Sequence, residues 1–121
     1  DNCAEALSLI GEVKDRDVII VDDEVDTGGS MAEAAFLAEK SGARGIYSVF
    51  VHPVLSNPAV DRLAASPITH LITTNTIPIL PADIKKLQKD RVVEILDISP
   101  LLGEVIRRAH EGRSVGEMFD E

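Results

Sequence analysis

The segment Asp22–Ser30 holds the side chains best suited to chemistry, because four acidic residues there precede a Thr-Gly-Gly-Ser sequence. The two glycines let the backbone approach a ligand closely and adopt positive φ. A helix beginning near Ser30 would gather the preceding amides at its N-terminus, where the helix dipole favours an anion. The pattern therefore indicates a small phosphate-binding loop. Its candidate residues are Asp26, Thr27, Gly28, Gly29 and Ser30.

The acidic residues indicate a ligand with two chemically different ends, since carboxylates alone would repel a phosphate. Asp22 and Asp23 follow an apolar run, which places them at the end of a predicted strand. Their carboxylates would accept hydrogen bonds from the hydroxyls of a ribose. They would also attract Mg²⁺, a cation that prefers oxygen ligands. The loop is thus predicted to bind a sugar phosphate at both ends, with Mg²⁺ shared between the sugar and the two carboxylates.

The same segment also fits an ordinary turn. A strand-to-helix connection with Asp, Thr, Gly and Ser is common loop chemistry. Ser30 and Glu33 have the spacing of a capping box, which accounts for the serine without any ligand. Glu24 and Val25 are interpreted as a solvated carboxylate and a packing residue. The spacing alone leaves both interpretations open.

The elements that would position this loop alternate along the chain. Apolar runs predict strands over Val18–Val21, Ile46–Val51, His70–Thr74 and Val92–Leu96. Such strands joined by helices indicate an α/β fold with a parallel β-sheet flanked by helices, a Rossmann-like three-layer domain. Ligands of such sheets bind beyond the C-terminal ends of the strands. The candidate segments at that edge are Asp22–Ser30, His52–Asn57, Thr73–Ile77 and Asp97–Ser99.

Three helices are predicted, each from a terminal signal. One covers Ser30–Ser41 and ends at Gly42, a natural residue after a helix. A short one covers Asn57–Leu63, since Pro is favoured in the first turn. The last opens at Ser99 and ends at Gly112. The proline-rich Ile77–Ala82 is expected to be a loop that leads into a turn of helix. The apolar stripe of the last helix comprises Leu101, Leu102, Val105, Ile106 and Ala109.

Length and composition limit the possible function classes. The 121 residues suffice for one domain, residues 1–121, with one core. A net charge of −9 and 3% aromatic residues argue against a nucleic-acid or membrane surface. The single cysteine, Cys3, permits no internal disulfide, which favours a reducing, cytoplasmic setting. The chain starts at Asp1 without Met, which favours a fragment or a processed chain.

The residues resemble a known family. Asp22–Ser30 resembles the PRPP-binding motif shared by type I phosphoribosyltransferases and ribose-phosphate pyrophosphokinases. The rest of the chain resembles the pyrophosphokinases, whose C-terminal domain has a type I phosphoribosyltransferase-like fold. Ser30 stands where the family usually has Thr, and Pro53 and Asn57 replace glycines. The further matching segments are His52–Ala59, Thr74–Pro78, Leu96–Leu102, Ile106–His110 and Ser114–Val115 with Phe119.

The resemblance implies an enzyme that transfers diphosphate from ATP to ribose 5-phosphate with Mg²⁺, giving PRPP and AMP, in a homo-oligomer. It implies that Asp22, Asp23 and the residues 26–30 bind ribose 5-phosphate. The family's ATP-binding N-terminal half and its Lys/Arg-rich loop would precede Asp1, so the chain alone is expected to be inactive and to carry no catalytic residue. The family's tail also contributes to a regulatory phosphate site. Here that site would comprise Arg113, Ser114, Val115 and Gly116.

Two other functions stay open. One is a type I phosphoribosyltransferase, which would need a hood over a base-binding pocket that no segment here could build. The other is a non-catalytic subunit, against which the intact acidic and Thr-Gly-Gly-Ser motif argues. His52, Thr73, Asn75 and Asp97 are weaker ligand candidates, and His70 and His110 are interpreted as structural or surface residues. The basic run Lys85, Lys86, Lys89 and Arg91 is interpreted as a solvated face.

Overall fold

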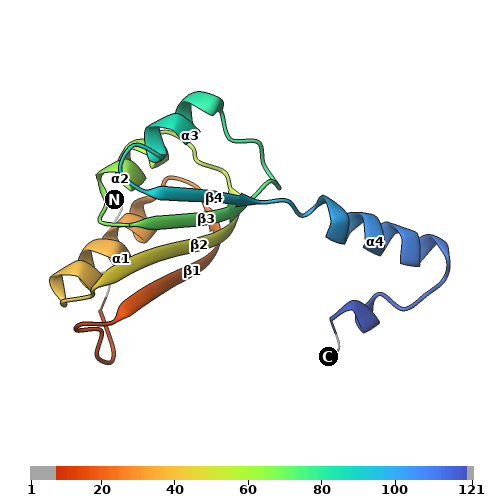
Figure 1. Cartoon of the computed structure of the whole chain (residues 1–121), viewed down its shortest axis with the longest axis horizontal. Helices are drawn as coiled ribbons and strands as arrows, with labels where there is room; N and C mark the ends of the chain where they lie inside the picture. The colour runs from red at the N-terminus through yellow and green to blue at the C-terminus, as the bar shows by residue number, and fades with distance from the viewer. Residues whose placement is uncertain (1–7, 120–121) are drawn as a thin grey trace, which may run out of the picture.

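The computed structural model describes residues 8–119, so Cys3 lies outside the described part. Four parallel strands form one sheet in the order β1-β2-β3-β4 (Figure 1). The strands are β1 (Asp17–Val25), β2 (Gly45–Pro53), β3 (His70–Thr74) and β4 (Val92–Leu96). The helices are α1 (Gly29–Lys40), α2 (Ala59–Ala65), α3 (Pro81–Leu87), α4 (Ser99–His110) and the 3₁₀ helix η1 (Gly116–Met118). The predicted parallel sheet flanked by helices is confirmed.

β3 and β4 have the predicted bounds, whereas β1 and β2 extend beyond theirs. β1 continues through the acidic residues to Val25 instead of ending at Val21. Asp22 pairs with Phe50 of β2, and Glu24 pairs with His52. Asp and Glu are poor strand formers, but pairing with β2 satisfies their backbone groups and overrides that preference. The connection from β1 to α1 is therefore only three residues long, Asp26–Gly28.

The three helices between the strands cover the same face of the sheet. Consecutive parallel strands that are also spatial neighbours, joined by right-handed crossovers, place every connecting helix on one side. One apolar core confirms this arrangement, because it joins the inner side of the sheet to α1, α2 and α3. Its members include Ala35, Ala38, Ile46, Phe50, Leu63, Leu71 and Leu87. On the other face, the described residues leave Ile19 64% exposed and Val21 73% exposed.

The ends of α1 differ from each other in how well the sequence predicted them. The predicted capping box of Ser30 and Glu33 is wrong. Gly28 is the N-cap residue, with φ 72°, and no side chain caps the helix. Ser30 is thus already inside α1. At the other end Gly42 has φ 87°, its amide donates to the carbonyl of Glu39, and the Ala43 amide donates to Ala38. This is the Schellman arrangement, which confirms the predicted role of Gly42.

The two shorter helices each begin at or directly after a proline. α2 begins at Ala59, directly after Pro58, and α3 begins at Pro81 within the proline-rich stretch.

The prediction that the basic run forms a solvated face is wrong for Arg91. Its guanidinium donates to the carbonyls of Leu63 and Ala64 at 2.6 and 2.7 Å, so it satisfies the C-terminal end of α2. Lys86 does lie at the surface, where it pairs with Asp61.

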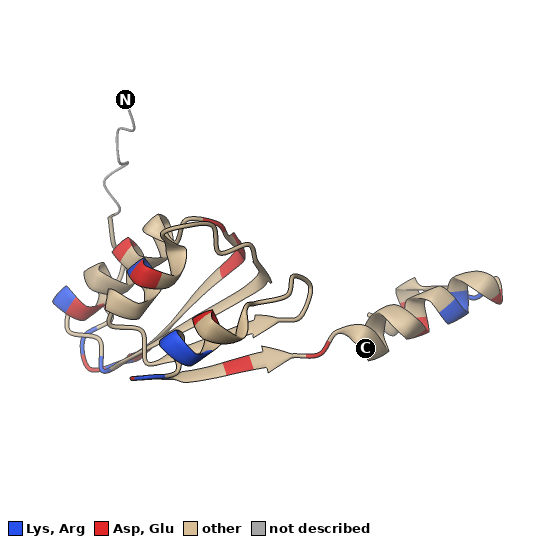
Figure 2. Ribbon diagram, turned by 90° about the horizontal axis from the view of Figure 1, so that it is seen from above, with Lys and Arg blue, Asp and Glu red and all other residues tan. Residues whose placement is uncertain are grey.

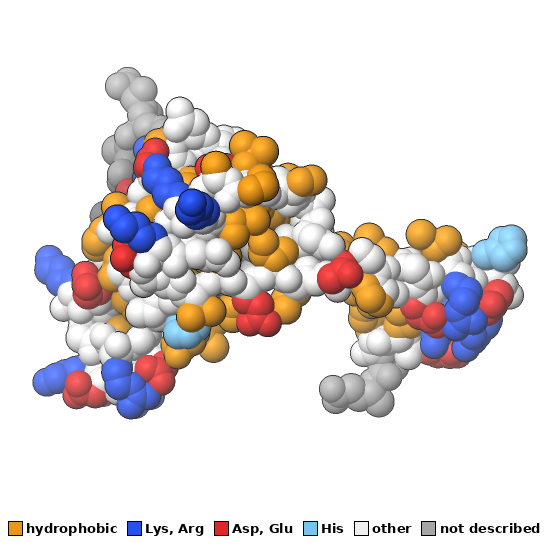
Figure 3. All heavy atoms as spheres, turned by 45° about the horizontal axis from the view of Figure 1, so that its top comes forward, with side chains coloured by type: hydrophobic (Ala, Val, Ile, Leu, Met, Phe, Trp, Pro, Cys, Tyr) orange, Lys and Arg blue, Asp and Glu red, His pale blue; other side chains and the backbone are white. Residues whose placement is uncertain are grey.

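α4 begins at Ser99 and is followed by Gly112 at φ 67°, as predicted. It points away from the sheet, joined to it by the short segment after β4 (Figures 1 and 2). No residue of α4 is buried. Its apolar side chains are therefore exposed, and orange side chains are visible on this projecting part in Figure 3. Ile106 is 69% exposed.

Candidate functional site

An open cavity of about 180 Å³ lies where β1 meets α1. It sits at the C-terminal end of β1, which is the edge where parallel sheets bind their ligands. Six of the seven predicted sugar-phosphate residues line it. The lining comprises Asp22, Glu24, Val25, Asp26, Thr27, Gly28, Gly29, Ser30 and Met31.

Asp23 is the predicted residue that the cavity does not include, and Glu24 lines it instead. Successive side chains of a strand point to opposite faces. Alternation along β1 would place Asp22 and Glu24 on one face and Asp23 on the other, although Val25, the next residue of the strand, also lines the cavity. Glu24, which the sequence indicates is a solvated carboxylate, is exposed and borders the open cavity. The same alternation would have indicated Glu24 from the sequence if the strand had been extended through Val25.

The opposite wall of the cavity consists of backbone amides at the start of α1. The first four N–H groups of a helix have no partner within it. In α1 these belong to Gly28, Gly29, Ser30 and Met31, and Ala32 makes the first helical bond, to the Gly28 carbonyl at 3.1 Å. No side chain caps these amides. The wall can therefore accept an anion, aided by the dipole of a 12-residue helix.

The tight turn at Gly28 has a steric reason as well as a conformational one. A Cβ atom on Gly28 would lie 3.2 Å from the Cα and carbonyl oxygen of Ala59, at the start of α2. At Gly29 a Cβ atom would have only ordinary contacts, with the Arg62 guanidinium at 3.5 Å and the Thr27 hydroxyl at 4.0 Å. The cavity thus combines a carboxylate side and an amide side within one segment.

The other candidates at the strand ends lie outside the cavity lining, and three of them make hydrogen bonds to neighbouring strand ends. The His52 Nδ1 atom lies 3.0 Å from the Thr76 hydroxyl. Thr73 is buried, and its hydroxyl has no hydrogen-bond partner among the described residues. Asn75 donates to the Asp97 carboxylate at 2.7 Å. These contacts link the ends of β2, β3 and β4.

Asp97 anchors the start of α4. Its carboxylate accepts the Ser99 hydroxyl at 2.6 Å and the Ser99 amide at 2.9 Å. These bonds and the one from Asn75 hold the pKa of Asp97 below its ordinary value, the Ser99 hydroxyl being the main cause. Asp97 therefore acts as a structural link between the sheet and the projecting helix.

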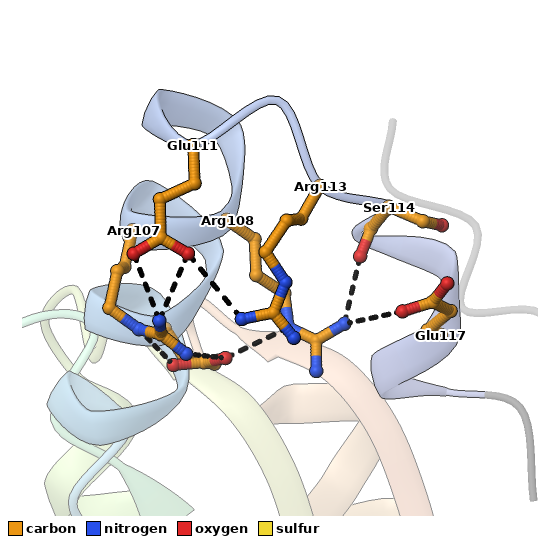
Figure 4. A network of polar contacts seen from close by, with 7 residues as sticks. Arg107, Arg108, Glu111, Arg113, Ser114 and Glu117 are labelled. Carbon is orange, nitrogen blue, oxygen red and sulfur yellow. Dashed lines mark hydrogen bonds and ion pairs between the residues drawn. The ribbon is translucent and has the colours of Figure 1, made fainter.

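The predicted regulatory segment lies beside α4 in a network of charged groups (Figure 4). Arg113 pairs with Glu111 at 3.4 Å, and the Ser114 carbonyl accepts a hydrogen bond from Arg108 at 2.9 Å. Arg108 also contacts Glu104 at 2.8 Å. Hydrogen bonds from Arg107 and then Arg108 lower the pKa of Glu104 to about 2.

Carboxylates near the cavity are suitable oxygen donors for Mg²⁺, but they do not form a metal site by themselves. Between residues 8 and 119 no group of three or more His, Cys, Asp or Glu side chains could hold a metal ion. An ion beside Asp22 and Glu24 would need further oxygen atoms from a ligand, as Mg²⁺ commonly does.

Among the helices that the structure describes, none has the length and apolar character needed to span a membrane.

Comparisons with known proteins agree with this arrangement. Residues 3–120 match the family described as the phosphoribosyl synthetase-associated domain. The ribose-phosphate pyrophosphokinases of Aquifex aeolicus and Caldanaerobacter subterraneus are 40% and 43% identical over 118 residues, which cover 98% of this chain and 36% of each relative. The crystal structure of phosphoribosylpyrophosphate synthetase from Mycobacterium smegmatis aligns with a TM-score of 0.77 and 37% identity, covering 85% of this chain and 33% of that one. This chain spans about a third of the length of these relatives.

Proposed function

The chain belongs to the family of phosphoribosyl synthetase-associated domains, and we propose that it is the acceptor-binding part of a ribose-phosphate pyrophosphokinase. The parent enzyme transfers diphosphate from ATP to the 1-hydroxyl of ribose 5-phosphate, giving PRPP and AMP. This chain binds the ribose 5-phosphate. The observation that carries the proposal is the cavity with carboxylates on one side and free amides of a helix start on the other.

The two sides of the cavity match the two ends of ribose 5-phosphate. The 5-phosphate accepts hydrogen bonds from the amides of Gly28–Met31, and the hydroxyls of Thr27 and Ser30 add donors. The ribose hydroxyls donate to Asp22 and Glu24, which project from the same face of β1. The acids thus repel a wrongly placed phosphate while the amides attract a correctly placed one.

Mg²⁺ is the proposed cofactor, and Asp22 with Glu24 would share it with the ligand. Its chemistry is to neutralise negative charge on phosphate and hydroxyl oxygens. The pair predicted from the sequence is Asp22 with Asp23; Glu24 joins Asp22 in this proposal because it lines the cavity, whereas Asp23 is not among the lining residues.

The remaining parts of the reaction are assigned to the parent protein. The ATP-binding half and the cations that transfer of a diphosphoryl group requires would lie in the two thirds of the relatives' length that this chain does not span. No Lys or Arg lines the cavity among the described residues. A homo-oligomer, a cytoplasmic location and a regulatory phosphate site at Arg113–Gly116 stay part of the proposal.

The direct test is a titration of the chain with ribose 5-phosphate. Binding is measured by calorimetry and by changes in the amide signals of Gly28–Met31 in NMR spectra. The Gly29→Val variant places two methyl groups beside the amide wall and is expected to abolish binding. Gly103→Val is the matched control, since a Cβ atom at Gly103, in the exposed helix α4, meets nothing within 4 Å. Equal affinity of Gly29→Val and the wild-type chain would remove this loop from the phosphate site.

A further inference from the structure

The phosphate-binding loop is held from outside by the segment that follows β2. The Leu55 amide donates to the carbonyl of Val25 at 2.9 Å. The Arg62 guanidinium, on α2, donates to the carbonyl of Thr27 at 3.1 Å. The carbonyl of the last residue of β1 and that of Thr27 in the short turn thus each accept a hydrogen bond from a residue that does not line the cavity.

A hydrogen bond that fixes the orientation of a backbone carbonyl also fixes the orientation of the N–H group of the next residue. The peptide unit is planar and trans, so its C=O and N–H bonds point in opposite directions. The bond from Arg62 turns the Thr27 carbonyl toward α2, and the Gly28 N–H must point the other way. Without that bond the peptide before Gly28 could rotate, because glycine tolerates both signs of φ. A rotated peptide would present a carbonyl oxygen to an anion instead of a donor.

Arg62 is suited to this task by its surroundings. Its neighbour Asp61 is engaged with Lys86, and Arg62 makes no ion pair with a carboxylate in the described part of the chain. Its guanidinium would lie 3.5 Å from a Cβ atom on Gly29, which puts its positive charge close to the amide wall. Since no carboxylate among the described residues competes for it, the Arg62 guanidinium is available to donate to the Thr27 carbonyl.

We propose that Arg62 is a positioning residue of the sugar-phosphate site, which keeps the Gly28 amide directed at the phosphate by holding the Thr27 carbonyl. The proposal rests on the function proposed above and adds a residue outside the Asp22–Ser30 motif. Arg62 acts through the loop and is not a catalytic residue. Lysine could replace its charge but not its planar fork of donors.

The test compares Arg62→Ala, Arg62→Lys and wild type in the 121-residue chain, titrated with ribose 5-phosphate and with inorganic phosphate. Arg16→Ala removes the same charge from an exposed position just before β1, at the opposite end of the strand, and is the matched control. Arg62→Ala is expected to raise the Kd about tenfold, or about 1.4 kcal/mol. Arg62→Lys is expected to recover only part of this loss, and Arg16→Ala to bind like wild type.

A second measurement separates positioning from charge and from stability. The Gly28 amide signal in NMR spectra of the unliganded chain is expected to shift in Arg62→Ala and Arg62→Lys, with the melting temperature little changed. Wild-type affinity in Arg62→Ala would overturn the inference, and so would full recovery in Arg62→Lys with an unshifted Gly28 signal. Failure of the wild-type chain itself to bind ribose 5-phosphate would instead contradict the proposed function, while the Gly28 signal still reports whether Arg62 orders the loop.

Discussion

Asp22, Asp23 and Glu24 are consecutive acids, yet only Asp22 and Glu24 line the cavity. Pairing of β1 with β2 extends through them, so alternation assigns Asp22 and Glu24 to the cavity and Asp23 to the other face. Six of the seven ligand-binding candidates of the motif line the cavity. The motif did not identify Glu24, because the expected end of the strand was placed at Val21, where the apolar run stops.

This alternation makes a prediction about the three acids. Asp22→Asn and Glu24→Gln are expected to weaken binding of ribose 5-phosphate by about 1.5 kcal/mol each, roughly tenfold in Kd, since each loses a charge-assisted hydrogen bond. Asp23→Asn removes the same charge from the other face and is the control. Calorimetric titration measures all three. An effect of Asp23→Asn as large as that of Asp22→Asn would contradict the assignment of faces.

Gly28 should be the least replaceable glycine of the loop. Gly28→Ala combines positive φ, which costs a residue with a side chain roughly 1–2 kcal/mol, with a 3.2 Å contact against the backbone of Ala59. Gly42→Ala is the control, because Gly42 also has positive φ but its close contact is the flexible Lys14 side chain. Chemical denaturation is expected to show the larger loss of stability for Gly28→Ala. Equal losses would mean that the contact with Ala59 has no cost of its own.

Among the elements, sequence predicted strands and helix ends well where local signals decide. The bounds of β3 and β4, the start of α4 and the residue after α1 all follow from apolar runs, Pro or Gly. The sequence did not predict contacts between side chains and backbone groups that are far apart along the chain. Arg91 binds the end of α2 from 27 and 28 residues away, and Arg62 reaches Thr27 across 35 residues. Neither contact has a spacing that could be recognised in one sequence.

The charged network of α4 predicts a response to pH. Pairing with Arg107 and Arg108 lowers the pKa of Glu104 from 4.5 to about 2. Since the folded-state pKa lies below the unfolded value, the stabilisation is complete above pH 4.5 and is lost as the pH falls toward about 2. Helix α4 is therefore expected to lose helicity over that range, and an NMR titration of the Glu104 carboxyl carbon measures the midpoint directly.

Variants separate the two arginines. Arg107→Ala is expected to raise the titration midpoint of Glu104 more than Arg108→Ala, because the hydrogen bond from Arg107 is the larger cause of the shift. Arg113→Ala, which contacts Glu111 and not Glu104, is the control. A midpoint near the ordinary value in the wild-type chain would show that the contacts in Figure 4 do not persist in solution.

At the scale of the whole molecule, apolar surface is distributed on two separate parts. The face of the sheet opposite α1, α2 and α3 exposes Ile19 and Val21, and the projecting α4 exposes Ile106. Within residues 8–119, β1 and β4 are the two edges of the sheet and pair with no further strand. Exposed apolar patches and unpaired strand edges favour association. The parent protein is expected to cover these surfaces, as the greater length of the relatives permits.

The isolated chain is therefore expected to be catalytically inactive and to self-associate. Transfer of a diphosphoryl group needs cations around the ATP phosphates. The residues that the structure describes line the cavity with carboxylates and amides and without Lys or Arg. PRPP formation from ATP and ribose 5-phosphate should be undetectable at any Mg²⁺ concentration, while binding of ribose 5-phosphate persists. Analytical ultracentrifugation should show species heavier than the 13.0 kDa monomer. Replacing Ile19 and Val21 by Thr, which keeps β-propensity on the open face, should shift the chain toward monomer. Turnover by a monomeric chain would contradict the division of the enzyme into an acceptor-binding part and an ATP-binding part.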